Sequence, residues 1–392
     1  MVLYSHDSQG LGHTRRNLAI AHALSAGIPG SAGRRVTGLL VTGESSATRF
    51  DIPDGWDWVV LPGIRKGHGG YRPRHLSIGQ KALVQLRRDM IDAVLERFRP
   101  DLVVVDRHAF GVDGELTQAL TNLRRKRPAC KVVLGLREVL DSPRTVEQEW
   151  KKLGGPDVVA SIFDQIWVYG DPAIHDPLRT GEIPWGLGHL VRYTGYLAAG
   201  RIARGSSTPV SRPYLLTMAG GGSDGFDLVI AAARAAVPAG YEHLVIAGPQ
   251  MPKEHRRRVE DAARPGTRVV AKVRDALSEI EGASAIVSMG GYNSVSEIMS
   301  TSAPALIVPR VEPRVEQLIR AEALARHDVV DVCHPDDLSS EAIAAWFVRV
   351  AGTEVDRSGV DLLGIDALAP LAAELLGSVA GTQGWRSARV AV

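Results

Sequence analysis

A glycine turn in the second half of the chain carries residues whose types and spacing suit a phosphate site. Gly290 and Gly291 lie between two apolar runs typical of buried strands, and they open an expected helix. Such a turn lets the backbone approach a ligand, while the free N–H groups and the helix dipole favour negative charge. Ser294 could bond a phosphate, and Glu297 could accept hydrogen bonds from two ribose hydroxyls. The segment predicts nucleotide binding, with a purely structural tight turn as the alternative.

A second glycine turn ends the first expected strand of the same half. It comprises Gly220, Gly221, Gly222 and Ser223. The first and fourth strands of a doubly wound sheet are commonly neighbours, so this turn and the one at 290–294 would meet and could both contact a pyrophosphate. Two unrelated tight turns are the alternative.

Polar residues follow two further strands of the second half. Glu316 and Gln317 come after the fifth strand, where an acid–amide pair suits hydrogen bonds to sugar hydroxyls. Arg310 or Arg314 could neutralise phosphate charge. Val273, in the loop after the third strand, could line a base pocket through its backbone. For the arginines and for this loop, a solvated position is the alternative.

The first half places a histidine at the start of an expected helix. His13 follows Gly12, and the helix dipole favours a neutral imidazole there. Such a histidine could take the proton of an attacking hydroxyl, or it could cap the helix or hydrogen-bond a ligand. Asp106, at the end of a strand, is the alternative base or the residue that orients one. Arg15 and Arg16 could contact an anionic acceptor or be solvated.

Other polar residues of the first half end strands or follow them. Arg137 and Tyr169 are such residues, and side chains at these positions tend to face the ligand cleft. Arg72 belongs to a basic, glycine-rich loop over 63–75 that could bind the acceptor or act as a lid. Each of these residues could instead be an ordinary polar residue at a strand end.

Short apolar strands alternate with helical stretches along the whole chain, which predicts parallel sheets with right-handed crossovers. The expected strands are 2–5, 36–41, 58–61, 102–106, 132–136, 214–217, 243–247, 268–271, 285–288 and 305–308. The expected helices are 13–26, 76–98, 225–236, 253–263, 275–281, 292–300 and 315–326. We therefore expect an α/β fold of two Rossmann-like, doubly wound parallel-sheet domains facing each other across a cleft.

A stretch rich in Gly, Ser and Pro divides the chain into two halves. The expected units are an N-terminal domain over 1–198, a linker over 199–212, a C-terminal domain over 213–360, a helix over 361–377 and a flexible tail over 378–392.

Composition narrows the class of protein. The formal net charge of +2 argues against a nucleic-acid partner. The only cysteines, Cys130 and Cys333, argue against a disulfide framework or a cysteine metal site. No signal peptide and no apolar run of transmembrane length is visible, so we expect a cytoplasmic protein without an integral membrane segment. Walker A, His-Glu-x-x-His and Asp-x-Asp motifs are absent from the sequence.

Four segments give the chain a resemblance to a known family. They are GLGHTRR at 10–16, GGGS at 220–223, SMGGYNSVSE at 288–297 and PRVEPRVEQ at 309–317. Together they span nearly the whole chain. The chain resembles the GT-B glycosyltransferases, in particular the MurG-like branch and the group of predicted actinobacterial glycosyltransferases. The resemblance implies transfer of a sugar from a nucleotide diphosphate, bound by the C-terminal domain, to a hydroxyl or amine of an acceptor held mainly by the N-terminal domain.

The resemblance also implies individual roles at the matching positions. Glu297 would bind the ribose, Ser223 and Ser294 the diphosphate, and Gln317 with Glu316 the donor sugar. His13 would lie beside the reacting centre. Family members usually act without a bound metal, which agrees with the missing Asp-x-Asp, and inversion at the anomeric carbon is expected by analogy. In such proteins the last helix often packs back on the N-terminal domain. The segment 7–12 has fewer glycines than the MurG type, so a lipid-linked acceptor is not implied.

The expected site therefore has three parts. The catalytic candidates are His13 and Asp106. The donor-binding candidates are Gly220, Gly221, Gly222, Ser223, Val273, Gly290, Gly291, Asn293, Ser294, Glu297, Arg310, Glu316 and Gln317. The acceptor-binding candidates are Gly12, Arg16, Arg72, Arg137 and Tyr169. We expect a UDP-, GDP- or dTDP-linked sugar as donor, a small-molecule or glycan acceptor, no permanently bound cofactor and no metal.

Two alternatives to a transferase share this architecture. A nucleotide-sugar epimerase would bind the same donor and need no acceptor. A non-catalytic nucleotide-sugar-binding subunit would bind the donor without turnover and would need a partner. Peripheral membrane contact through surface apolar residues is compatible with all three.

Overall fold

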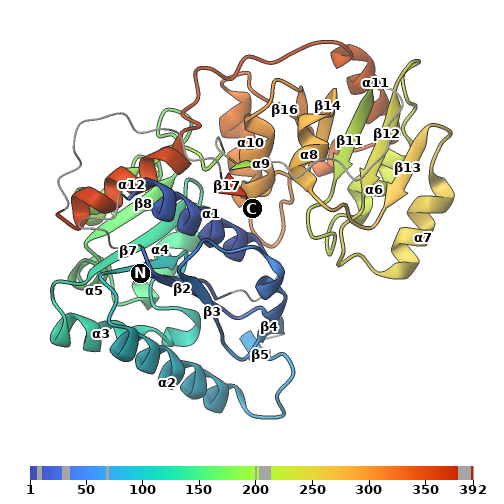
Figure 1. Ribbon diagram of the computed structural model, residues 1–392. Helices are drawn as coiled ribbons and strands as arrows, with labels where there is room; N and C mark the ends of the chain where they lie inside the picture. The colour runs from blue at the N-terminus through green and yellow to red at the C-terminus, as the bar shows by residue number, and fades with distance from the viewer. Residues whose placement is uncertain are drawn as a thin grey trace.

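The computed structural model describes residues 1–6, 11–28, 36–67, 70–198, 201–202, 213–377 and 390–391. Figure 1 shows two bodies, one formed by the first half of the chain and one by the second, each built on a parallel sheet with helices packed against it. The structure thus confirms the expected fold of two Rossmann-like domains.

The N-terminal sheet has the strand order β3-β2-β1-β6-β7-β8-β9. Its strands are β1 (Val2–Tyr4), β2 (Gly38–Thr42), β3 (Trp56–Val60), β6 (Leu102–Asp106), β7 (Lys131–Arg137), β8 (Gln165–Tyr169) and β9 (Val191–Tyr193). All neighbouring pairs are parallel. Strands β1, β6 and β8 are buried along their whole length, as expected where helices cover both faces of a sheet. The strand order reverses at β1 and β6, which makes their carboxyl ends the topological switch point.

Helices and short elements complete the N-terminal domain. The helices are α1 (Gly12–Gly27), α2 (Gln80–Phe98), α3 (Thr117–Lys126), α4 (Pro143–Lys152) and α5 (Pro156–Ile162). Three 3-10 turns, η2 (Ser45–Arg49), η3 (Val112–Gly114) and η4 (Trp185–Leu190), and a hairpin of β4 (Ile64–Gly67) and β5 (Gly70–Pro73) connect them. The helix expected over 76–98 begins only at Gln80, because Gly79 before it is extended.

The C-terminal sheet has the order β13-β12-β11-β14-β15-β16, again parallel. Its strands are β11 (Tyr214–Met218), β12 (Glu242–Ile246), β13 (Thr267–Val270), β14 (Ala285–Ser288), β15 (Ala305–Ile307) and β16 (Asp331–Val332). The first and fourth strands, β11 and β14, are neighbours, as the sequence predicts. Met218 pairs with Ser288 at their ends, so the two glycine turns that follow leave the sheet at the same edge.

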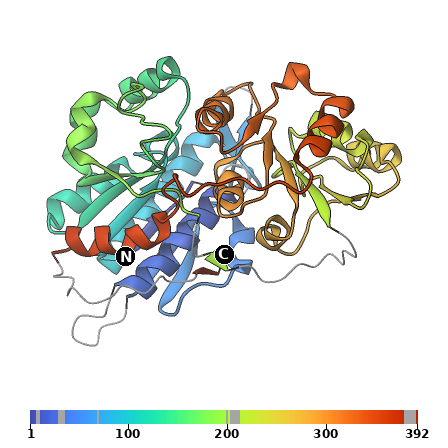
Figure 2. The same cartoon turned by 90° about the horizontal axis from the view of Figure 1, so that it is seen from above.

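The second half contributes helices to both bodies. They are α6 (Phe226–Arg234), α7 (Lys253–Ala262), α8 (Ala276–Glu281), α9 (Tyr292–Met299), α10 (Glu316–Ala325), α11 (Ser340–Val350) and α12 (Gly364–Leu375), with the 3-10 turn η5 (Pro335–Asp337). Helix α12 lies against α1 of the N-terminal domain, beside the blue N-terminal segment (Figures 1 and 2). The chain therefore crosses between the two bodies twice.

Two short strands come from the segments expected to be linker and tail. Strand β10 (Arg201–Ile202) pairs in parallel with β17 (Val390–Ala391). The other residues of the expected linker over 199–212 and of the expected tail over 378–392 lie outside the described residues. Within the part of the chain that the structure describes, no helix combines the length and apolar character needed to cross a bilayer.

Candidate functional site

The starts of α1 and α9 touch where the two domains meet. The Nδ2 atom of Asn293 donates a hydrogen bond to the carbonyl oxygen of Gly12 at 3.0 Å. One turn further along each helix, Nη2 of Arg15 lies 3.2 Å from Oε1 of Glu297, whose side chain is only 2% exposed. These contacts bring the expected ribose-binding carboxylate and the histidine-bearing helix to one place.

The glycine turns after β11 and β14 have backbone conformations that require glycine. The φ angles of Gly220, Gly222 and Gly290 are +57°, +86° and +78°, in the region that side chains disfavour. A Cβ on Gly222 would lie 2.3 Å from the carbonyl oxygen of Ala247, and one on Gly290 would lie 2.6 Å from Cγ2 of Ile307. Gly222 and Gly290 are therefore held close to neighbouring segments with no room for a side chain, whereas a Cβ on Gly220 or Gly291 would meet no atom within 4 Å.

The other residues of these turns are at or near the surface. Gly221 and Ser223 are exposed, and the hydroxyl of Ser223 donates a hydrogen bond to Oδ1 of Asp224 at 3.2 Å. Gly291 is the N-cap of α9, and Ser294 is half-buried in the first turn of this helix. The turns thus present backbone and hydroxyl groups at the sheet edge that faces the N-terminal domain.

The two helix starts that meet here share an electrostatic property. Neither α1 nor α9 has a side-chain hydrogen bond at its N-cap, and neither has an acidic residue in its first turn. The positive ends of both helix dipoles are therefore uncompensated by carboxylates of their own helices. An anion between them would be stabilised by both dipoles and by free backbone N–H groups.

Glu316 is enclosed by arginines. It accepts two hydrogen bonds from Arg137, one of them from Nη1 at 3.1 Å, and Nη2 of Arg310 lies 3.8 Å from its Oε1. Burial opposes ionisation of Glu316, but the positive charges of Arg137 and Arg320 outweigh it and lower its pKa to about 2. The neighbouring Gln317 uses its Oε1 to accept the backbone N–H of Arg310 at 2.9 Å, so it bonds its own loop. Glu316 is thus an ionised carboxylate at the domain interface.

Three sequence-predicted residues lie apart from these contacts. Val273 is half-buried and packs against the hydrophobic core after β13. Arg72 is exposed on the β4–β5 hairpin. Tyr169 is fully buried, with the guanidinium of Arg16 5.8 Å from its ring centroid. Because Tyr169 is fully buried, it contacts the site through Arg16 and not through its own surface.

His13 and Asp106 form a close pair at the switch point of the N-terminal sheet. Nδ1 of His13 lies 2.6 Å from Oδ2 of Asp106, which is fully buried. Arg16 holds the same carboxylate, with Nη2 2.9 Å from Oδ1 and 2.7 Å from Oδ2. Burial alone would raise the pKa of Asp106, but the charges of Arg16 and His13 keep this pKa well below its usual value. Asp106 is thus an ionised carboxylate that orients the imidazole of His13.

Two further histidines surround this pair. The ring centroid of His6 lies 4.8 Å from that of His13 and 4.5 Å from that of His108. Burial, followed by neighbouring imidazoles, lowers the pKa of His6 well below its usual value. Burial and the charge of Arg107 lower the pKa of His108 to about 3. The sequence assigned no role to either histidine, although each follows a strand at the switch point. Among the described residues, no group of three or more His, Cys, Asp or Glu could hold a metal ion.

A second set of ion pairs joins β7 to the start of α10. Arg320 is buried and donates to Glu138 across the interface, and its Nη1 also donates to the carbonyl of Gly290 at 3.2 Å. Nη1 of Arg314 lies 3.1 Å from Oδ2 of Asp141. These pairs fix α10 against the N-terminal domain. No local sequence pattern could have identified them, since they depend on how the two domains meet.

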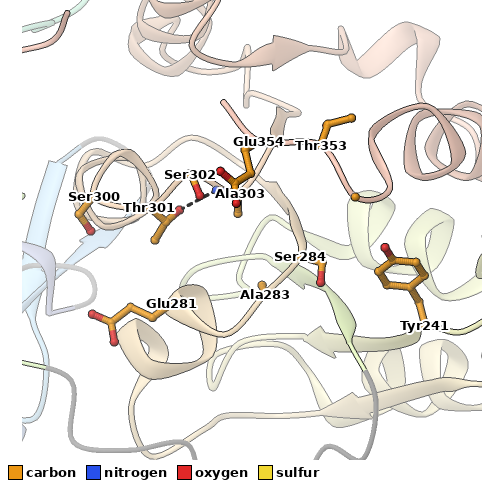
Figure 3. Close-up of a pocket in the computed structure, with 11 residues that line it drawn as sticks. Tyr241, Glu281, Ala283, Ser284, Ser300, Thr301, Ser302, Ala303, Thr353 and Glu354 are labelled. Carbon is orange, nitrogen blue, oxygen red and sulfur yellow. Dashed lines mark hydrogen bonds between the residues drawn. The ribbon is translucent and has the colours of Figure 1, made fainter. Parts of the chain in front are cut away.

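A cavity of about 420 Å³ lies elsewhere, at the amino edge of the C-terminal sheet (Figure 3). Ser284 precedes β14 and Ala303 precedes β15, whereas the Gly290 turn follows β14 at the opposite edge. The hydroxyls of Ser300 and Thr301 bond carbonyls of their own helix. No candidate from the sequence lines this cavity, so it is separate from the site described above.

Comparisons with known proteins support the fold. No protein-family model matches the chain, and no curated protein matches it. Among solved structures, the calicheamicin glycosyltransferase CalG4 is similar with a TM-score of 0.59 at 18% identity, covering 97% of this chain and 99% of that one. The glycosyltransferase VinC, in complex with dTDP, gives 0.58 at 16% identity, covering 96% and 99%.

MurG of Acinetobacter baumannii gives a TM-score of 0.55 at 15% identity, covering 96% of this chain and 99% of MurG. The similarity to all three structures extends over both domains. It confirms the GT-B architecture that the sequence resemblance implied.

Proposed function

We propose that this chain is a glycosyltransferase that moves a sugar from a nucleotide diphosphate to a hydroxyl or amine of an acceptor. The proposal includes inversion at the anomeric carbon and activity without a bound metal. The observation that carries it is the His13–Asp106 pair, with Nδ1 2.6 Å from Oδ2, on a helix whose start touches the Gly291-capped helix α9. A base and an anion-binding edge then face the same reacting centre.

The C-terminal domain supplies the donor side in this proposal. The two glycine turns and the start of α9 bind the diphosphate, Glu297 binds the ribose, and Glu316 with Gln317 binds the sugar. The backbone around Val273 lines the base. A GT-B structure similar to this chain, VinC, holds dTDP, which supports a nucleoside diphosphate as the common part of the donor. We infer a UDP-, GDP- or dTDP-linked sugar.

The reaction is a single displacement. The acceptor oxygen or nitrogen forms a bond to the anomeric carbon as the bond from that carbon to the diphosphate oxygen breaks. The bonding electron pair leaves with the diphosphate, and backbone N–H groups of both turns stabilise the developing charge. The acceptor proton passes to Nε2 of His13, the ring atom opposite the contact with Asp106. One displacement on the face opposite the leaving group inverts the anomeric configuration.

Asp106 acts through His13 in this mechanism. Its lowered pKa makes it a poor proton acceptor, and its full burial keeps it from the acceptor. An ionised carboxylate at Nδ1 fixes the imidazole orientation and stabilises the imidazolium that forms on proton transfer, as in other carboxylate–histidine pairs. Arg16 keeps the carboxylate ionised and in place.

The test has two stages. Thermal unfolding of the purified chain with UDP, GDP, dTDP and ADP identifies the base, since a ligand at about 100 times its Kd adds roughly 2.7 kcal/mol of stability. The sugar nucleotides of that base are then incubated with an acceptor panel, without acceptor, and with EDTA. Acceptor-dependent release of nucleoside diphosphate, unchanged by EDTA, supports the proposal. A changed sugar without acceptor would indicate epimerisation, and no stabilisation by any nucleotide would remove the proposal.

A further inference from the structure

The two carboxylates assigned to the donor's hydroxyls are already paired with arginines of the opposite domain. Glu297 is paired with Arg15, Nη2 to Oε1 at 3.2 Å, and Glu316 is bound by Arg137 through both terminal nitrogens. The carboxylates belong to the C-terminal domain and the arginines to the N-terminal domain. A donor that engaged Glu297 and Glu316 would therefore compete with both ion pairs.

The four side chains of these ion pairs are largely buried, so breaking a pair without replacing it costs free energy. The side chains of Glu297 and Glu316 are 2% and 8% exposed, and those of Arg15 and Arg137 are 24% and 16% exposed. A buried charge that loses its partner is costly. Ribose and sugar hydroxyls can satisfy the carboxylates as hydrogen-bond donors, but they bring no charge for the arginines. The displaced guanidinium groups need a new anion nearby.

Arg15 and Arg137 each have a nitrogen that could donate a hydrogen bond to such an anion. In the described part of the chain, Nε of Arg15 and Nε of Arg137 are buried and make no hydrogen bond. Arg15 rises from the first turn of α1, whose start touches that of α9, and neither helix has an acidic residue in its first turn. A diphosphate seated at this junction would lie against both positive helix ends, within the region that Arg15 already spans.

We propose that Arg15 and Arg137 exchange their carboxylate partners for the donor's diphosphate when the ribose and sugar engage Glu297 and Glu316. The inference rests on the proposed function and assigns the leaving group's positive partners to the N-terminal domain. Without ligand the two ion pairs close the cleft. With a nucleoside diphosphate sugar the same arginines hold the two domains together through the phosphates.

The exchange discriminates between ligands. A nucleoside without phosphates must break the Arg15–Glu297 pair and supplies no anion to pair with the guanidinium of Arg15. A nucleoside diphosphate breaks the same pair and supplies the new anion. Arg15 therefore weakens nucleoside binding and strengthens diphosphate binding, and both effects disappear when Arg15 is removed. Arg137 exchanges its partner only for a ligand that also carries the sugar, because Glu316 is assigned to the sugar.

The chain offers a matched control. Arg314, which the sequence left open as a phosphate partner, also crosses the interface, but both its terminal nitrogens are engaged, Nη1 3.1 Å from Asp141 and Nη2 2.8 Å from Glu149. Its carboxylate partners belong to the N-terminal domain, so no donor hydroxyl in the proposed site competes for them. Arg314→Ala breaks an interdomain ion pair without releasing a donor-binding carboxylate.

The experiment measures Kd by calorimetry for two ligands of the base that stabilises the wild-type chain. They are the nucleoside and the nucleoside diphosphate sugar, which carries the group that engages Glu316. The variants are Arg15→Ala, Arg137→Ala, Arg15→Lys and Arg314→Ala, each checked for cooperative thermal unfolding. For both alanine variants at Arg15 and Arg137 we expect affinity for the diphosphate sugar to fall about tenfold while nucleoside affinity is kept or rises. Arg15→Lys should recover part of the diphosphate affinity, and Arg314→Ala should keep the wild-type ratio of the two constants.

The outcomes separate the two proposals. A wild-type chain that binds no nucleoside diphosphate overturns the proposed function. A wild-type chain that binds, with Arg15→Ala and Arg137→Ala losing affinity for both ligands in equal proportion, overturns the exchange and leaves the arginines a structural role. Unchanged diphosphate affinity in the alanine variants, or an equal change of ratio in Arg314→Ala, also overturns it. If the alanine variants unfold, Arg15→Lys and Arg15→Gln give the same comparison.

Discussion

Nδ1 of His13 lies 2.6 Å from Oδ2 of Asp106, and this contact joins the first turn of α1 to the end of β6. Arg16, three residues further along α1, binds both oxygens of the same carboxylate. An ionised carboxylate can only accept a hydrogen bond, so Nδ1 carries the hydrogen and Nε2 is the basic atom. Nη2 of Arg16 also lies 3.0 Å from Nδ1, but it already donates to both carboxylate oxygens. The orientation of one imidazole is thus set by two charged groups that are themselves buried.

Replacement of His13 by alanine tests its role as the base. Because His13 is not among the residues assigned to the donor nucleotide, His13→Ala should keep the Kd for that nucleotide. It should lower kcat by about a hundredfold or more, the usual contribution of a general base. The measurements are steady-state turnover and calorimetric nucleotide binding. His189→Ala, at an exposed histidine of η4, is the control and should keep full turnover. Near-full turnover in His13→Ala would show the base assignment to be wrong.

Replacement of Asp106 by asparagine separates positioning from proton transfer. The amide keeps a hydrogen-bond acceptor beside His13 but removes the charge that pairs with Arg16, which is 3% exposed. We expect a loss of about 3 kcal/mol in the free energy of unfolding, since a buried ion pair loses one partner. We also expect lower kcat with a shifted pH profile, because the imidazolium loses its counter-charge.

The control for Asp106→Asn is Glu96→Gln, which breaks an exposed pair with Lys126. Denaturant unfolding should show almost no change for that variant. If Asp106→Asn lowered turnover with an unchanged pH profile, Asp106 would act on stability alone.

The local sequence patterns identified the parts of this site that depend on neighbouring residues in the chain. Alternation of strands and helices predicted both sheets, and the glycine runs predicted tight turns. In the structure, Gly222 and Gly290 of these turns have no room for a side chain. The pairing of β11 with β14 followed from the usual strand order of such sheets. These features need no knowledge of how the two domains meet.

Other features depend on tertiary contacts that a sequence does not reveal. The pairs Glu138–Arg320 and Arg15–Glu297 exist only because the domains face each other in one particular way. Tyr169 ends a strand, but the sequence could not tell which face of the sheet it would occupy or that Arg16 would cover it. The side-chain amide oxygen of Gln317, at the start of α10, accepts the backbone N–H of Arg310. Polar side chains often form such local hydrogen bonds with the backbone.

Replacement of Glu297 by alanine tests the donor site directly. If Glu297 binds the ribose, Glu297→Ala should abolish most of the thermal stabilisation that the preferred nucleotide gives the wild-type chain. Loss of two charge-assisted hydrogen bonds should weaken binding by about a hundredfold. The measurement is the nucleotide-induced shift in Tm. Glu281→Ala, at an exposed carboxylate that lines the separate cavity, is the control and should keep the wild-type shift. An unchanged shift in Glu297→Ala would place the ribose elsewhere.

Acid titration tests the charge of Glu316. Its pKa falls from the ordinary value of 4.5 to about 2 in the folded chain, because the charges of Arg137 and Arg320 outweigh the effect of burial. Between these two values the unfolded chain binds a proton that the folded chain does not, so stability falls as the pH decreases through this range. Glu316→Gln lacks this pH-dependent contribution to the free energy of unfolding, and it leaves Arg137 without its counter-charge. We expect the variant to have a lower Tm than wild type above pH 4.5, and the two Tm curves to converge as the pH approaches 2. Parallel curves over the whole range would show that Glu316 does not carry the expected charge at the interface.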